Sequence, residues 1–310
     1  MNYAPILIPT LNRYNHLKRC VESLAKCTHA DKTDLFIALD YPLKEEHWEG
    51  YRKIKEYVSN IDGFNTVTII QRDHNYGPVE NFFNAQNQIY EKYDRIIYSE
   101  DDNEFSPNFL DYINKGLEIY YNEDKVQNIC GYNYKVKIPQ KYKYNTYFSN
   151  AFSAWGYGSW RHKQDKFIYD VDEIKSFLKN PINAYRSAII PLHVLLGLLA
   201  IVKTGNITGD RNAVFNNLKN NTLCLFPRLS LVRNMGHDGS GEHCNTKDYN
   251  YFAKQEIGNN DIFNMYRIDV KESFRIKYEL TIYNIRYSGG IRYIAKCILF
   301  YFQTIGKYIL

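Results

Sequence analysis

The chain has 310 residues, which is long enough for one large domain or two modest ones with a sizeable core. Hydrophobic residues make up 45% and charged residues 24% of it, which is ordinary for a soluble globular protein. The net charge is +5, and segment 271–310 alone holds seven basic and two acidic residues. A nucleic-acid-binding protein would spread such charge over a folded surface, so we expect no nucleic-acid partner.

Cysteine spacing and the N-terminus bear on the compartment. The six cysteines, at positions 20, 27, 130, 224, 244 and 297, include no CxxC pair, which argues against a zinc site. Their sparse distribution fits a reducing compartment. Residues 3–8 begin a folded segment without a basic and apolar signal pattern, so the sequence predicts a cytoplasmic protein.

The first half of the chain alternates between strand and helix patterns. Short apolar or β-branched runs predict strands at residues 4–8, 35–39, 66–70, 95–98 and 126–130. Apolar stripes at helical spacing lie between them, and we expect Pro78 to open one helix. Ser106 and Pro107 are expected as the cap and first residue of another. This alternation predicts an α/β fold, with a mostly parallel sheet flanked by helices.

Polar side chains follow these strands where each strand ends, and the carboxyl ends of parallel strands meet at one edge of a sheet. We therefore expect one ligand site, built from these residues: Thr10, Asn12 and Arg13; Asp40; Arg72, Asp73 and Asn75; and Glu100, Asp101 and Asp102.

The acidic run Glu100-Asp101-Asp102 is the strongest candidate for chemistry. Mg²⁺ and Mn²⁺ prefer oxygen ligands, commonly one or two carboxylates together with substrate phosphates. Three adjacent acids repel one another unless a cation or hydroxyl groups receive them. The alternative is a solvated acidic turn before the helix at Ser106.

The other strand ends offer groups for a nucleotide. Thr10 and Asn12 suit a base or ribose, and Arg13 suits a phosphate; the alternative is an ordinary helix N-terminus. Asp40 suits a ribose or base, or is a turn residue before Pro42. Near Asn75, Gly77 would allow close backbone approach and the helix at Pro78 could face a phosphate, unless this is a plain connection.

The second half is less regular, but three features stand out. Trp155, Tyr157 and Trp160, separated by glycine and serine, could stack on sugar rings or form a small core cluster. Asp210, at the start of a helical stretch, could act as a general base or cap that helix together with Thr208. Residues 237–243 form a glycine-rich polar loop that could close over a diphosphate, with His237 as a further candidate metal ligand.

Taken in order, residues 3–245 resemble glycosyltransferases of the GT-A fold, a Rossmann-like architecture, and in particular bacterial family 2-type enzymes. The sequence is also similar to N-acetylglucosaminyltransferase I. Residues 100–102 and the following 105–109 resemble the Glu-Asp-Asp metal motif and its helix. Residues 154–161 resemble the Trp-Gly-Trp-Ala-x-Trp motif, with Tyr157 and Gly158 departing from it. Asp210, then Pro227 and residues 231–236, resemble the helix that carries the acidic base and the Asn-x-Gly segment that follows it.

This resemblance implies an inverting, metal-dependent transfer of a sugar from a nucleotide sugar. Asp102 would ligate Mn²⁺ or Mg²⁺, and Glu100 and Asp101 would bind the donor sugar and ribose. The nucleotide, a UDP-sugar by analogy, would be held by Thr10, Arg13 and Asp40, while Asp210 would deprotonate the acceptor. The alternative is a non-catalytic nucleotide-sugar or glycan-binding protein. A nucleotidyltransferase is disfavoured, because no Gly-rich, lysine-containing loop follows the first strand.

The predicted organisation is a catalytic domain at 1–250, with a nucleotide-sugar-binding half at 1–131 and an acceptor-binding half at 132–250. Residues 251–310 form a basic helical tail. Within the tail, Ile291, Ile294, Ile298, Phe302 and Ile305 lie at helical spacing, in a run too short to span a bilayer. We therefore expect peripheral contact with the inner face of the cell membrane and a glycan or lipid-linked acceptor; the alternative is a helix pair that packs on the domain or on a second copy.

Overall fold

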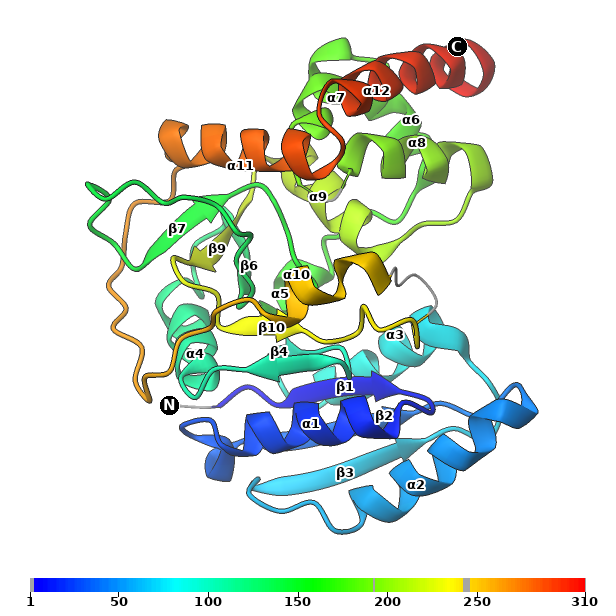
Figure 1. The fold of residues 1–310 in the computed structure, drawn as a ribbon, viewed down its shortest axis with the longest axis vertical. Coiled ribbons are helices and arrows are strands. Elements are labelled where there is room, and N and C mark those ends of the chain that lie inside the picture. Colours follow the sequence, from blue (N-terminus) through cyan, green and yellow to red (C-terminus); the bar gives the residue numbers. More distant parts are fainter. Residues whose placement is uncertain (1–2, 192, 242–245, 310) are drawn as a thin grey trace.

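The computed structural model describes residues 3–191, 193–241 and 246–309, and its centre is an eight-stranded sheet (Figure 1). In spatial order the strands are β3 (Thr66–Gln71), β2 (Asp34–Leu39), β1 (Ile6–Thr10), β4 (Arg95–Tyr98), β8 (Tyr157–Trp160), β6 (Val126–Cys130), β9 (Leu223–Pro227) and β7 (Thr146–Ser149). Only β8 and β7 run antiparallel to their neighbours within this sheet. The predicted α/β class with a mostly parallel sheet is therefore confirmed.

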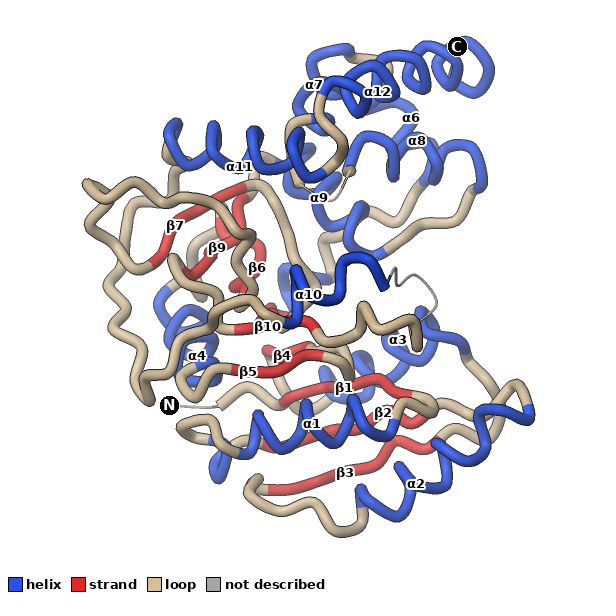
Figure 2. Tube along the Cα trace, viewed as in Figure 1, coloured by secondary structure: helices blue, strands red, loops and turns tan. Residues whose placement is uncertain are grey.

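Helices cover the sheet and extend beyond it, as Figure 2 shows. Among the described residues the α-helices are α1 (Tyr14–Ala25), α2 (Trp48–Val58), α3 (Gly77–Tyr90), α4 (Phe109–Ile119), α5 (Arg161–Gln164), α6 (Val171–Leu178), α7 (Pro181–Ala188), α8 (Val194–Thr204), α9 (Gly209–Asn220), α10 (Tyr249–Ala253), α11 (Phe274–Tyr287) and α12 (Ile291–Thr304). Short helical turns are η1 (Ala30–Lys32), η2 (Glu45–His47), η3 (Thr246–Asp248) and η4 (Ile305–Ile309).

The two faces of β1 explain why its sequence is an apolar run rather than an alternating one. Ile6 and Ile8 pack in the larger core with Leu17 of α1, while Leu7 packs on the other face with Ala85 of α3. A strand of a parallel sheet that is covered on both faces buries every side chain, so it lacks the alternation of a half-exposed strand. The first two residues of β1, Ile6 and Leu7, pair with Ile97 and Tyr98 of β4.

The helix predicted to start at Ser106 begins later. The N-cap of α4 is Asn108, and Ser106 is buried, with its hydroxyl donating to Asn108 Oδ1 at 2.7 Å. Residues before it are extended because β5 (Asn103–Phe105) pairs with β10 (Val232–Asn234), and the Ser106 amide donates to Leu231 O at 2.9 Å. The expected cap was wrong because this pairing joins segments far apart in the sequence.

The second half completes the same sheet and adds a layer of helices. Strand β8 lies between β4 and β6, so the predicted boundary at residue 131 does not divide the sheet. Helices α6 to α9 pack on one another, and α12 packs on α7 and α8 (Figure 1). In the described part of the chain, no helix is both long and apolar enough to cross a membrane.

Candidate active site

The acidic run lies at the carboxyl end of β4, beside the end of β1. The backbone passes from β4 through Ser99, whose amide donates to Leu7 O of β1 at 3.0 Å. Asp101 and Asp102 are buried, and Glu100 is half-buried. The predicted position of the triplet at a strand end is thus what the structure shows, and the carboxylates sit in a partly dehydrated setting.

Arg13, which immediately precedes α1, is the counter-ion of this cluster. Its guanidinium forms ion pairs with Asp101 and with Asp102, the latter at 2.8 Å between Nη1 and Oδ2. Burial alone lowers the pKa of Arg13, but the charges of the two aspartates outweigh it and raise that pKa above its ordinary value. Thr10 at the end of β1 donates to Asp101 Oδ2 at 2.8 Å. In this structure, therefore, Thr10 and Arg13 position carboxylates.

A second support for Asp102 comes from the segment after β10. Asn234 Nδ2 donates to Asp102 Oδ1 at 2.6 Å, and the Met235 amide donates to the Asp102 carbonyl at 2.8 Å. Gly236 lies so close that a methyl group at this position would overlap the Asp102 carboxylate. The resemblance included this segment without giving Asn234 or Gly236 a role, because their contacts join residues more than 130 positions apart.

Asp210 brings a fourth carboxylate to the cluster. It is the second residue of α9, half-buried, and burial raises its pKa against the opposing charge of Arg211. Burial, followed by the charges of Asp102 and Asp210, raises the pKa of Glu100 well above its usual range. The charge of Asp210 thus acts on Glu100, although α9 follows β4 by more than a hundred residues.

The donor set fits a divalent cation that is held jointly with a substrate. The guanidinium of Arg13 pairs with both Asp101 and Asp102, which leaves negative charge on these two carboxylates that a hard cation would balance. Within the described residues, no three His, Cys, Asp or Glu side chains are arranged to hold a metal by themselves. A cation bound through Asp102 would take its remaining ligands from a diphosphate and water, as Mg²⁺ and Mn²⁺ commonly do.

His237 lies near Asp102 and packs against aromatic side chains. Its ring stacks on Phe252 at 4.3 Å between centroids, and its Nδ1 atom is buried without a partner among the described residues. Burial lowers the pKa of His237, while the charges of Asp248 and Asp102 oppose this. A neutral imidazole with a free nitrogen can accept a hydrogen bond or bind a metal. Residues 242–245, at the end of the predicted glycine-rich loop and including Cys244, lie outside the described residues.

The loops after β2 and β3 meet at the rim of the site. Asp40 Oδ1 accepts from the amides of Tyr41 at 2.8 Å and Tyr76 at 2.9 Å. Asn75 Nδ2 donates to Tyr41 O at 2.6 Å and reaches Asp40 Oδ2 at 3.4 Å. Asp40 and Asn75 are therefore together, as predicted, and join two loops.

Two positions near the site require glycine, each for a different physical reason. A methyl group on Gly77 would meet no protein atom within 4 Å, so its φ of +71°, and not a neighbouring group, is what requires glycine in the fold. The predicted approach of a ligand to this backbone stays a prediction. At Gly50, by contrast, a methyl group would overlap the Asn12 carbonyl. Asn12 itself is half-buried in the loop between β1 and α1.

The aromatic motif divides into one half-buried residue and two core residues. Trp155 is half-buried, with ring centroids 4.7 Å from Tyr132 and 5.9 Å from His237. Tyr157 is buried in β8, against Tyr98 at 5.3 Å. The ring of Trp155 is therefore placed beside the candidate metal ligand His237.

Trp160 cannot serve as the predicted acceptor contact, because it is fully buried. Its indole donates to Leu117 O at 3.1 Å, and the ammonium of Lys163 lies 3.8 Å from its ring centroid. Strand β8 lies in the middle of the sheet, so this side chain points into the core beneath α4. The alternative interpretation, a core residue, is correct for this position.

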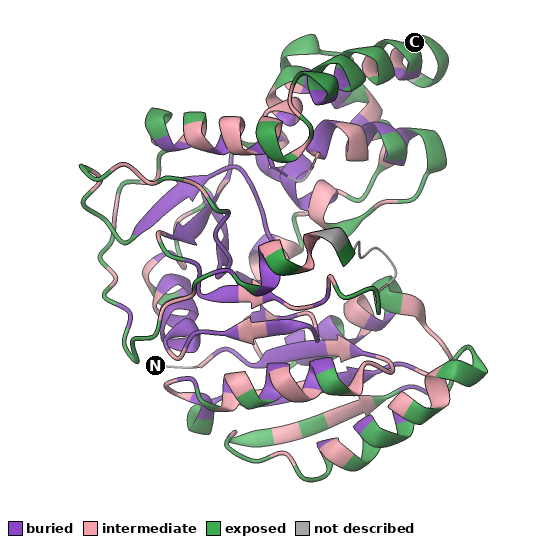
Figure 3. Cartoon of the chain, in the orientation of Figure 1, coloured by how far each residue is buried: buried purple, intermediate pink, exposed green. Residues whose placement is uncertain are grey.

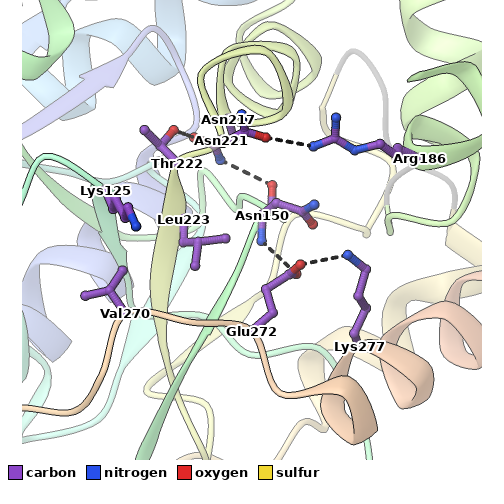
Figure 4. A pocket seen from close by; sticks show the side chains of 10 residues that line it. All are labelled: Lys125, Asn150, Arg186, Asn217, Asn221, Thr222, Leu223, Val270, Glu272 and Lys277. Carbon is purple, nitrogen blue, oxygen red and sulfur yellow. Dashed lines mark hydrogen bonds and ion pairs between the residues drawn. The ribbon is translucent and has the colours of Figure 1, made fainter. Parts of the chain in front are cut away.

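A separate polar cavity of about 300 Å³ lies at the other edge of the sheet (Figure 4). Lys125 and Leu223, which line it, are at the amino-terminal ends of β6 and β9, whereas the acidic run follows the carboxyl end of β4. Glu272 in this cavity pairs with Lys277 at 2.7 Å, and Arg186 bonds Asn221 Oδ1 at 3.3 Å. It shares no lining residue with the acidic cluster and is not part of that site.

No protein-family model matches the chain, and no curated protein matches it. Among solved structures, it is similar to the mannosyltransferase PcManGT from Pyrobaculum calidifontis in complex with GDP-Man and Mn²⁺ (12% identity, TM-score 0.35), covering 52% of this chain and 45% of that one. It is also similar to S. aureus TarS 1-349 in complex with UDP (13% identity, TM-score 0.38), covering 70% of this chain and 71% of that one. The chain thus spans less than half the length of the mannosyltransferase, and overlaps of this size assign no function.

Proposed function

We propose that this chain is an inverting, metal-dependent glycosyltransferase that moves a sugar from a nucleotide-sugar donor to a glycan or lipid-linked acceptor. The observation that carries the proposal is the ion pair of Arg13 with Asp102 beside Glu100, a carboxyl whose pKa is raised by burial and then by the charges of Asp102 and Asp210. Arg13 precedes α1, Asp102 follows β4 and Asp210 is in α9, so these residues are far apart in the sequence. No local preference for helix or strand would bring them together. A solvated acidic turn would not need a guanidinium, a glycine and an asparagine packed around it.

In this proposal the residues around the cluster divide the work of holding the donor. Asp102 would ligate Mn²⁺ or Mg²⁺, with His237 as a further ligand, and Glu100 would accept from a donor-sugar hydroxyl. Asp101 is already bonded by Thr10 and Arg13, so it would reach the ribose with the lone pairs that remain. Asp40, Asn75 and Asn12 would line the nucleotide side, and a UDP-sugar is the donor we test first.

The reaction needs a base on the acceptor side. Asp210 would accept the proton of the acceptor hydroxyl while that oxygen attacks the anomeric carbon, and the bond from this carbon to the diphosphate oxygen breaks with inversion. A carboxylate with a raised pKa suits this task, because it takes a proton more readily than an exposed aspartate. When bound, a divalent cation would neutralise the charge that develops on the leaving diphosphate. Trp155 would stack on a sugar ring of the acceptor.

The proposal includes a cellular location, which depends on the basic C-terminal segment and on the proposed lipid-linked acceptor. We place the enzyme at the cytoplasmic face of the cell membrane, in the synthesis of a bacterial surface polysaccharide. Support comes from the basic segment 271–310.

A panel of nucleotide sugars tests the proposal. Purified protein is incubated with each donor, with Mn²⁺ or with chelator, and release of the nucleoside diphosphate is measured. We expect turnover of at least one donor that chelation abolishes and that Asp102→Asn reduces strongly. Full metal-dependent activity of Asp102→Asn would overturn the metal assignment, and binding without any turnover would favour the non-catalytic alternative.

A further inference from the structure

Helix α12 presents an apolar stripe to solvent, although it is packed against the protein on its other side. Ile291, Ile298 and Phe302 are 84%, 55% and 68% exposed, and Ile294 is also exposed. They recur at spacings of three, four and seven residues, which places them on one face of the helix. Figure 3 shows α12 as largely exposed along its length. Exposed apolar side chains that form a contiguous stripe mark an interaction surface.

The opposite face fixes the orientation of this stripe. Tyr293 and Cys297 are buried, and the Tyr293 hydroxyl donates to Ala188 O at 3.1 Å. About two turns after Tyr293, the Tyr301 hydroxyl donates to Leu178 O at 3.0 Å. These contacts attach α12 to the ends of α7 and α6, so the helix cannot rotate to bury its apolar stripe without losing them. The stripe is therefore a fixed outer surface of the protein.

The charges beside the stripe have one sign. Arg292 and Lys296, one turn apart, are exposed beyond Leu299, which is itself 55% exposed and lies between them and the stripe around the helix. Arg286 and Lys307 are exposed before and after α12. Segment 280–310 contains no aspartate or glutamate. Among the described residues, neither Arg292 nor Lys296 forms an ion pair with a carboxylate; the ion pairs of segment 271–310 involve Lys271, Arg275 and Lys277. A partner for this surface must therefore be both apolar and negatively charged.

We propose that the exposed face of α12 docks on an anionic lipid bilayer, with the apolar stripe in the interface and Arg292 and Lys296 at the headgroups. This rests on the proposed function, which places the acceptor on a lipid. An interfacial helix has this arrangement of apolar stripe and basic flank. A second copy packed stripe against stripe would instead bring like charges together without compensating acids.

The packing also connects this surface to the candidate active site. Helix α8 contacts α12 on one side and α9 on the other, and α9 carries Asp210 near its start. If α12 docks on a membrane, only α8 separates this helix from α9, the helix that carries the proposed base.

Vesicle flotation of the full chain tests the proposal. We expect it to bind vesicles that contain phosphatidylglycerol but not pure phosphatidylcholine vesicles, and to be released by high salt, because surface attraction is screened. Ile298→Ser with Phe302→Ser, and separately Arg292→Glu with Lys296→Glu, should each lower the bound fraction at least about tenfold. Matched controls are Leu229→Ser with Ile262→Ser, which are 47% and 53% exposed elsewhere, and Arg52→Glu with Lys55→Glu on α2.

The outcomes separate this proposal from the catalytic one. Asp102→Asn should float like the wild type, and the α12 variants should keep turnover of a soluble donor. Equal flotation of α12 variants and controls, or no flotation of the wild type, would overturn the docking proposal. So would light scattering that shows a dimer converted to monomer by Ile298→Ser with Phe302→Ser, since a second copy would then be the occupant.

Discussion

The backbone of Gly236 lies against the carboxylate of Asp102, with no room for a β-carbon between them. Glycine is needed here for close approach, and Asn234 two residues earlier donates to the other oxygen of the same carboxylate at 2.6 Å. The segment after β10 therefore fixes the position of the residue that we assign to the metal. Groups that orient a ligand matter nearly as much as the ligand itself.

Gly236→Ala should move the Asp102 carboxylate and weaken binding of Mn²⁺ together with donor by about 10- to 100-fold. Titration calorimetry with Mn²⁺ and a nucleoside diphosphate measures this directly. Gly306→Ala is the control, because a methyl group there meets nothing within 4 Å. Unchanged affinity in a folded Gly236→Ala protein would contradict the assignment of Asp102.

Arg13→Ala should leave Asp101 and Asp102 without their counter-ion. We expect the free energy of unfolding to fall by about 2 kcal/mol, less than for a fully buried pair, because Arg13 is partly exposed. Added Mn²⁺ should restore part of this loss, since it supplies positive charge at the same carboxylates. Urea unfolding with and without Mn²⁺ checks both statements, with the exposed Arg52→Ala as control. An absence of rescue would argue against a cation site at this position.

The raised pKa values of Glu100 and Asp210 predict a pH dependence of stability. The folded chain keeps protons on these carboxyls that the unfolded chain has already released, so stability is present in acid and is lost as pH rises through the raised folded pKa values. Thermal melts of the metal-free protein should therefore show a lower Tm at neutral pH than in mildly acidic buffer.

Glu100→Gln should flatten this profile and raise Tm at neutral pH by about 2–4 °C, equivalent to roughly 1 kcal/mol. The exposed Glu45→Gln should leave the profile unchanged. Parallel profiles of Tm against pH for the wild type and Glu100→Gln would contradict this prediction, because they would show that the pKa of Glu100 is not raised in the folded chain.

The two tryptophans of the aromatic motif should behave differently. Trp160→Phe removes a buried indole and its bond to Leu117 O, so it should lower the free energy of unfolding by about 2 kcal/mol without changing the acceptor KM. Trp155→Ala should raise the acceptor KM and destabilise the fold less, because Trp155 is only half-buried. A raised acceptor KM for Trp160→Phe would mean that the core position of Trp160 changes when substrate binds.

The sequence was informative where structure is local. Strands β1, β2 and β4 are short apolar runs because helices cover both faces of the sheet, and each is followed or ended by a polar residue of the site, namely Thr10, Asp40 and Glu100. The position of the acidic run at the end of β4 follows from that pattern alone. The edge strand β3 instead has exposed and half-buried side chains along its length. Arg13 and Asp40 could be placed at the same edge because parallel strands end together.

The sequence was less informative where structure depends on distant pairing. Strand β8 contains glycine, serine and two aromatic residues, so its sequence suggested a ligand cluster, whereas it is a central strand between β4 and β6. The pairing of β5 with β10 displaced the start of α4 and brought Asn234 to Asp102. Nothing within a few residues of Ser106 or Asn234 signals these contacts.

The most direct test of the central claim compares Asp210→Asn with the wild type, using the donor that the panel identifies. Donor binding in the presence of Mn²⁺ is measured by calorimetry, and transfer to acceptor is measured in the same preparations. We predict that Asp210→Asn binds the donor as the wild type does but loses transfer by at least about a hundredfold, as expected for removal of a general base. Wild-type transfer by Asp210→Asn would contradict the account, because the acidic cluster at the end of β4 would then lack its proposed base.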